Sequence, residues 1–271
     1  MNFLGAMESP LRTHELWRAA GEAHRTAAID CLETLIMSDE RVYASIFDNM
    51  DEEWKAKDAH LARRMYCLQF LRPEHLDVKR VHAIHPAVVI ARTHLRRFSE
   101  VRSPREKLES VYQAAQAIFR MLHETAPFGQ AASADEFLPV FILCVLHAKP
   151  WRPYCGIEYV TLFRNPRLAS GEHQYFLVQL LTAVTFLDTL TPASLTIDAT
   201  EFARAFAAYQ ERWDLELAQR VHAEELLAAA GGVAGGGAGG GGGAGVQGER
   251  AFGGGLMQEL RDIGADELLD F

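Results

Sequence analysis

Two segments of this chain are apolar on nearly every side of a helix, and they restrict the fold more than any other feature. The sequence over 137–146 is FLPVFILCVL, and over 175–187 it is YFLVQLLTAVTFL. A helix without a polar face has to be covered by its neighbours. We therefore predict that these segments form the central pair of a helical bundle. The link over 149–171 is rich in proline and glycine, which predicts loops and short turns.

The remaining segments repeat the helical period, and the alternation typical of strands is scarce. Apolar residues recur at helical spacing within 28–36, within 106–122 and within 200–230. Ser103, followed three positions later by Glu106, gives the second of these a helix start signal. We predict an all-α fold, a compact helical bundle in which amphipathic helices wrap the two apolar ones.

Composition separates the C-terminal part of the chain from the rest. After an amphipathic helix predicted at 196–230, 15 of the 25 residues at 231–255 are glycine, which predicts a flexible glycine-rich linker. The tail peptide at 256–271, with five acids and one arginine, is either a disordered acidic tail or a peptide that folds when it docks a further partner.

Charge and apolar patterning exclude several classes of protein. The formal net charge is −9, and no basic arm offsets it, which argues against nucleic acid as a partner. No stretch approaches the roughly 20 apolar residues of a membrane span, and the N-terminus lacks the pattern of a secretory signal. The four cysteines form no CxxC pair, so we expect reduced thiols in a cytoplasmic protein.

The sequence contains none of the motifs of the common enzyme classes. GxSxG, GxxxxGK[ST], HExxH and a GxGxxG between strand and helix are all absent. The histidines and cysteines near 75–85 and 144–155 lack the paired ligand spacing of a zinc site. We therefore predict no metal, no cofactor and no covalent chemistry.

The stretch SADEFLP places acids at the open end of the first apolar segment. Ser133 and Glu136 match the capping box S-x-x-E, which would leave Asp135 in the first helical turn. Pro139 removes one helical hydrogen bond, so either the helix bends there, or it begins one to three residues after Asp135 with that residue as its cap. Both versions put the carboxylate at the positive end of a buried helix, pointing out of the bundle. A purely structural capping role would also account for an acid at this position.

Tyr175 presents a similar choice at the start of the second apolar segment. It follows Ser170-Gly171-Glu172 and falls in the first turn of the predicted helix. An aromatic residue there is either part of the core or half-buried with its hydroxyl at the rim. Both apolar helices thus begin with a polar group that is able to reach outward.

Together these residues resemble the Vps-nine (vacuolar protein sorting nine) domain family over roughly residues 60–195. The resemblance implies a domain at 61–195 with its core at 98–195, preceded by N-terminal helices at 1–60. Domains of this family are guanine-nucleotide exchange factors for Rab-five-type GTPases on early endosomes. LQFLRPEHLDV at 68–78 and SPREKL at 103–108 resemble the segments that lead into such a domain. The matching elements, in order and at the expected spacing, are Ala134-Asp135 with Phe137 and Pro139, Ile157 with Tyr159, Phe163-Arg164-Asn165-Pro166, Gly171-Glu172 with Tyr175, and Ala183 with Phe186.

The resemblance implies a role for each residue of the predicted site. Asp135 would be a finger inserted into the nucleotide site of the GTPase, and Tyr175 would help to hold the partner's switch regions. Pro139 would shape the helix that presents the finger. A threonine that often follows the tyrosine by three positions is Val178 here, so a hydroxyl contact is missing. We expect further partner contacts from Pro139, Val140, Val178 and Gln179.

The resulting hypothesis is an exchange factor that promotes GDP release from a Rab-five-type GTPase in endosomal vesicle trafficking. Such a protein would be cytoplasmic and recruited to early endosomes, with peripheral association to their membrane. The alternative is a non-catalytic helical adaptor that binds a small GTPase without releasing its nucleotide.

Overall fold

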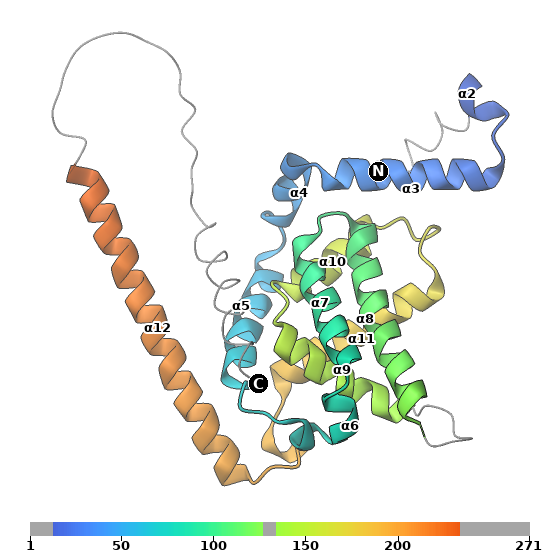
Figure 1. The fold of residues 1–271 in the computed structure, drawn as a ribbon. Helices are drawn as coiled ribbons and strands as arrows, with labels where there is room; N and C mark the ends of the chain where they lie inside the picture. The colour runs from blue at the N-terminus through green and yellow to red at the C-terminus, as the bar shows by residue number, and fades with distance from the viewer. Residues whose placement is uncertain (1–12, 127–133, 234–271) are drawn as a thin grey trace. The chain divides into compact units, whose positions relative to one another are not determined.

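The computed structural model describes residues 13–126 and 134–233, in which every regular element is helical (Figure 1). The all-α prediction is therefore confirmed. The residues up to Trp213 form one compact unit, and a second unit begins at Asp214, inside the last helix. The helices are α2 (Glu15–Arg18), α3 (Glu22–Ser38), α4 (Glu40–Phe47), α5 (Glu52–Cys67), α6 (Arg80–Ala83), α7 (Pro86–Glu100), α8 (Pro104–Thr125), α9 (Ala134–Ala148), α10 (Pro153–Phe163), α11 (Gly171–Thr189) and α12 (Ala199–Val233), with short 3-10 turns η1 (Pro73–Leu76) and η2 (Pro192–Ser194).

Some predictions concern residues outside the described ranges. These are the capping role of Ser133, the first twelve residues of the chain, the linker from residue 234 onward and the acidic peptide at 256–271. The first three residues of the predicted linker are the end of α12, so this helix passes the expected boundary at residue 230.

α9 is the central helix of the first unit, packed between α7, α8 and α11 (Figure 1). Nine of its twelve side chains from Phe137 to Ala148 are buried, and the other three are half-buried. The prediction of a central apolar helix is confirmed for this segment.

α11 buries one face and exposes the other. Leu180, Ala183 and Val184 are among the residues that face the core. On the opposite side Tyr175 is 51% exposed and Val178 is 56% exposed. Neighbouring helices therefore do not enclose α11 in the way they enclose α9, and part of its apolar surface faces solvent.

A helix occupies the link between α9 and α11, where proline and glycine predicted loops. α10 begins with Pro153, a position at which the missing N–H of proline is tolerated. Asp58 of α5 caps this helix, because its carboxylate accepts hydrogen bonds from the backbone N–H groups of Tyr154 and Cys155 at 2.8 and 2.9 Å. Burial raises the pKa of Asp58, although these hydrogen bonds oppose the rise. The cap comes from a distant segment, so the sequence of the link does not contain this signal.

A buried ion cluster joins α3 to the residues that follow α10. Arg164 Nη1 lies 2.6 Å from Asp30 Oδ1 and 2.7 Å from Glu33 Oε1. The backbone N–H of Asn165 donates to the second oxygen of Glu33 at 2.9 Å, and the Glu33 side chain is fully buried. The Arg164-Asn165 pair therefore positions α3 against the rest of the unit.

Gly156 allows α10 to approach α7 closely, which predicts the effect of an added methyl group. A Cβ at this position would lie 2.6 Å from Cε1 of Phe98, whose ring is fully buried and has no room to move. We expect Gly156→Ala to lower the free energy of unfolding by roughly 2 kcal/mol, measured by urea denaturation. Gly171→Ala is the matched control, because a Cβ there has no neighbour within 4 Å. Equal urea midpoints for the two variants would contradict the close packing.

The buried ion cluster predicts a second stability effect. Arg164→Gln leaves the carboxylate of Glu33 buried without its cation, so we expect a loss of roughly 3–5 kcal/mol in the free energy of unfolding. Arg25→Gln removes a half-buried arginine that pairs with the exposed Glu22 at 3.0 Å, and this control should lose less than about 1 kcal/mol. Urea denaturation of both variants measures the difference. Similar small losses would show that the cluster does not secure α3.

Candidate functional site

Asp135 is the second residue of α9 and its side chain is exposed. The helix begins at Ala134, so the version that places Asp135 in the first turn is correct, and the version that makes it the cap is wrong. Pro139 lies inside the helix and has no N–H to donate to the carbonyl of residue 135. The carboxylate thus sits at the positive end of the helix dipole, on the open end of the central helix.

The neighbouring acid is tied to the protein itself. Glu136 forms an ion pair with Lys79, which lies just before α6. The two adjacent carboxylates differ in exposure: Glu136 is half-buried and fixes the first turn of α9 to the α6 region, whereas the side chain of Asp135 is exposed.

Three phenylalanines connect the starts of α9 and α11. Phe137 of α9 stacks on Phe119 of α8, with ring centroids 4.5 Å apart. Phe176 of α11 lies 5.9 Å from Phe137 and 5.8 Å from Phe119. Asp135 comes two residues before one of these rings and Tyr175 directly before another. The Phe119–Phe137–Phe176 cluster therefore brings the two predicted site residues to the same end of the bundle.

Polar contacts with α8 orient the first turn of α11. Glu172 accepts a hydrogen bond from Gln116 Nε2 at 3.0 Å, and the ring of His173 stacks on Tyr112 with centroids 4.1 Å apart. Burial and the negative charge of Glu172 raise the pKa of Tyr112. With these two residues turned toward α8, Tyr175 projects from the exposed side of the helix.

The other predicted partner contacts fall into two groups. Val178 is exposed, and Gln179 and Pro139 are half-buried, so each of these presents surface near Tyr175 or Asp135 along its own helix. Val140 is 1% exposed, so the prediction that it contacts a partner is wrong. An α-helix turns about 100° per residue, which carries position 140 away from the face of Asp135 and into the core.

Sequence reasoning missed three further surface residues of the same helices. Leu138 lies one turn after Asp135 and is half-buried, and both Leu181 and Thr182 are exposed on α11. Helical spacing from Asp135 and from Tyr175 contains the signal for Leu138 and for Thr182, since residues three, four and seven apart share a face. The exposed strip on α11 therefore extends two turns beyond Tyr175.

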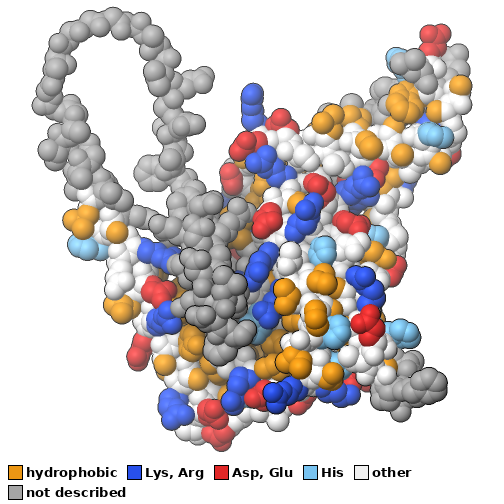
Figure 2. Space-filling view, viewed as in Figure 1, with side chains coloured by type: hydrophobic (Ala, Val, Ile, Leu, Met, Phe, Trp, Pro, Cys, Tyr) orange, Lys and Arg blue, Asp and Glu red, His pale blue; other side chains and the backbone are white. Residues whose placement is uncertain are grey.

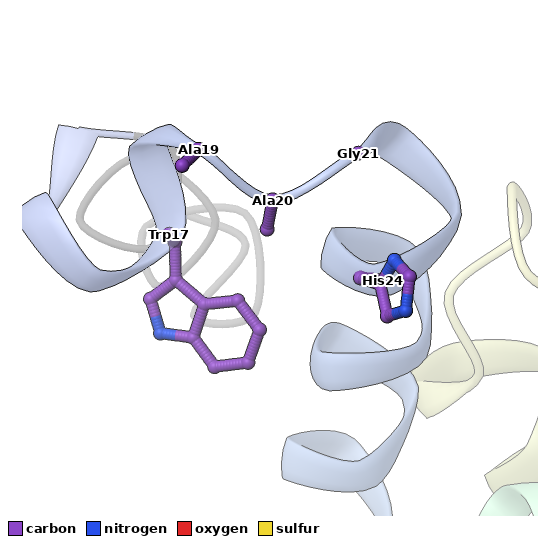
Figure 3. Close-up of a pocket in the computed structure, with 5 residues that line it drawn as sticks. All are labelled: Trp17, Ala19, Ala20, Gly21 and His24. Atoms are coloured by element: carbon purple, nitrogen blue, oxygen red, sulfur yellow. The ribbon is translucent and has the colours of Figure 1, made fainter.

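The remaining candidate sites in the described residues carry little chemistry. The hollow shown in Figure 3 lies where α2 leads into α3, and its lining is Trp17, Ala19, Ala20, Gly21 and His24. One imidazole among small residues is not the convergent set of polar groups that marks a catalytic pocket. Over residues 13–126 and 134–233, no group of three His, Cys, Asp or Glu side chains is placed to hold a metal. Over the same residues, no helix has the length and hydropathy of a membrane span.

Comparison with known protein families gives a match that covers this site. The model of the vacuolar sorting protein 9 (VPS9) domain matches residues 89–192. The matched range contains the whole of α8, α9, α10 and α11, and with them Asp135, Tyr175 and the three phenylalanines.

Relatives in fungi, plants and animals agree with this match. Vacuolar protein sorting-associated protein vps901 of Schizosaccharomyces pombe is 29% identical over 217 residues, which cover 74% of this chain and 36% of that protein. Vacuolar protein sorting-associated protein 9A of Arabidopsis thaliana is 27% identical over 212 residues, covering 78% of this chain and 40% of that protein.

The Rab5 GDP/GTP exchange factor of Homo sapiens is 32% identical over 180 residues, covering 65% of this chain and 36% of that protein. The chain spans less than half the length of each of these three relatives. Residues 89–192 thus match the VPS9 domain, and these relatives share that similarity with the chain.

Proposed function

We propose that this chain is a guanine-nucleotide exchange factor that promotes GDP release from a Rab-five-type GTPase on endosomal membranes. The observation that supports it most strongly is the exposed Asp135 carboxylate on the first turn of α9, beside the exposed apolar side of α11 and inside the range that matches the VPS9 domain. The printed name of the human relative, Rab5 GDP/GTP exchange factor, supports the class of GTPase.

The chemistry of a GTPase explains why a carboxylate suits this task. A GTPase holds its nucleotide through Mg²⁺, a phosphate-loop lysine and backbone amides, all of which favour negative charge. In the proposed mechanism Asp135 pairs with the lysine, takes the place left by the metal ion and repels the β-phosphate of GDP. The carboxylate then stabilises the nucleotide-free state more than the bound state, and this difference accelerates release. No covalent step is required.

The exposed strip of α11 supplies the second part of the proposed interface. Tyr175 and Val178 offer apolar surface, and Gln179 adds a polar group at the same end of the helix. Leu138 and Pro139 continue this surface onto α9. An exposed apolar strip with polar edges suits a protein partner, and we assign it to the switch segments of the GTPase.

A non-catalytic adaptor is the second candidate, and Val178 is the observation that favours it. Valine carries no hydroxyl to bond a switch region, so the partner would be held by apolar contacts and by the charge of Asp135. An adaptor would bind the GTPase through the same surface and leave its nucleotide in place.

Removal of one charge tests the finger directly. Asp135→Asn keeps the shape of the side chain, and we expect the rate of GDP release from a Rab-five-type GTPase to fall roughly a hundredfold. The measurement is the fluorescence decay of mant-GDP under excess unlabelled nucleotide. Because the residue is exposed, the free energy of unfolding should change by less than about 1 kcal/mol.

Glu201→Gln is the matched control for this experiment. Glu201 is an exposed acid in the first turn of α12, so its substitution changes the net charge and a helix start in the same way. We expect wild-type exchange from it. A wild-type rate of GDP release with Asp135→Asn would show that Asp135 does not act as the finger.

The apolar strip predicts a separate defect in partner binding. Val178→Asp places a charge in the middle of the proposed interface, and we expect the exchange rate at limiting concentration to fall at least about tenfold, because a buried unpaired charge costs several kcal/mol. Leu35→Asp alters an exposed leucine of α3 and should leave exchange unchanged. Titration of both variants against the GTPase measures this; equal activities would place the interface elsewhere.

A further inference from the structure

The segment around α6 and α7 has a charge composition unlike the rest of the chain. Residues 78–99 contain five lysines or arginines and no acid. The whole chain has a net charge of −9 and 36 acids among 271 residues, so a segment of this length would hold roughly three acids on average. The exchange mechanism proposed above makes no use of this segment.

Aliphatic side chains on α6 and α7 face solvent instead of the core. Ile84 is 73% exposed and Val89 is 63% exposed, and Val81 and Ile90 are each close to half exposed. Figure 2 shows hydrophobic side chains gathered over these helices with Lys and Arg side chains beside them. We call this the α6–α7 surface; its exposed residues are Arg80, Val81, Ile84, Val89, Ile90 and Arg97, and the half-buried Arg96 lies beside them on α7.

Acids lie at the edge of this surface, and three of them face a base or a histidine. Glu136 of α9 pairs with Lys79. Glu124 of α8 lies 3.6 Å from the His85 imidazole, and Glu106 of α8 lies 3.9 Å from the Arg97 guanidinium. A fourth acid, Glu100, is exposed at the C-terminal end of α7. The aliphatic and basic groups of the surface lie between these acids.

Cations also surround His147 near the C-terminal end of α9. Burial, and after it the charges of Arg92, Lys149 and Arg96, lower the pKa of His147 to about 4. Three cations therefore act on the same half-buried imidazole, which indicates a positive local potential.

We propose that the α6–α7 surface docks on a lipid bilayer that carries anionic headgroups. Aliphatic side chains on a helix face enter the boundary between headgroups and acyl chains, and the surrounding bases pair with lipid phosphates and carboxylates. The α6–α7 surface carries both the aliphatic and the basic side chains that such docking requires. The ion pair of Lys79 with Glu136 joins this surface to the first turn of α9, so docking holds the Asp135 end of the bundle close to the membrane.

Vesicle sedimentation with the full chain tests the proposal without any GTPase, so its result is independent of the exchange function. We expect binding to vesicles of equal parts phosphatidylserine and phosphatidylcholine, little binding to pure phosphatidylcholine, and release by high salt. Arg80→Ala with Arg97→Ala should weaken the partition coefficient roughly thirtyfold, at about fivefold for each base. Ile84→Ser with Val89→Ser should weaken it at least about tenfold.

Matched pairs of substitutions elsewhere on the chain test whether the effect is specific to this surface. They control for a general loss of positive charge or of exposed apolar area. Arg41→Ala with Arg204→Ala removes two exposed arginines, and Leu35→Ser with Leu162→Ser removes two exposed leucines; both should bind as the wild type does. Urea midpoints close to that of the wild type confirm that all variants are folded. Absence of wild-type binding to anionic vesicles, as expected if an acidic protein is the true occupant, overturns the proposal. Equal losses in the control pairs overturn it as well.

Discussion

The packing of three phenylalanine rings determines where the proposed site residues of this chain lie. Phe119, Phe137 and Phe176 come from three helices and meet with centroids 4.5 to 5.9 Å apart. Such pairs contribute about 0.5–1.5 kcal/mol each beyond the area they bury. The chain leaves this cluster toward the surface within one or two residues, at Asp135 on one side and at Tyr175 on the other. A charge and an apolar strip are thereby held at one end of a rigid bundle.

Helices outside the matched residues 89–192 also hold the domain together, through buried polar contacts. α5 supplies the Asp58 cap of α10, and α3 supplies the carboxylates that hold Arg164. Both contacts are buried and polar, so each is costly to break and specific in its geometry. The matched domain therefore depends on helices that precede residue 89, and the predicted boundary at residue 61 falls inside α5. We propose that the folding unit begins before that boundary.

Sequence patterns predicted the features that depend on local periodicity. The all-α class, the buried α9 and the start of α8 at Ser103 follow from apolar spacing and capping signals; Ser103 Oγ accepts the backbone N–H of Glu106 at 3.2 Å. Features that depend on distant partners were not predictable in this way. Proline and glycine predict loops where α10 lies, because the Asp58 cap that starts this helix comes from α5. Val140 lies five residues after Asp135, so the turn of the helix carries its side chain into the core.

Preference for one nucleotide state is the most direct test of the central claim, since an exchange factor has to bind the empty GTPase most tightly. The affinity of the full chain for a Rab-five-type GTPase should be measured in the nucleotide-free, GDP-bound and GTP-bound states by isothermal titration calorimetry. A finger that replaces the metal and the phosphates predicts clear preference for the nucleotide-free form. Equal affinity for all three states, or tightest binding to the GTP-bound form, would contradict this account and identify the chain as an adaptor.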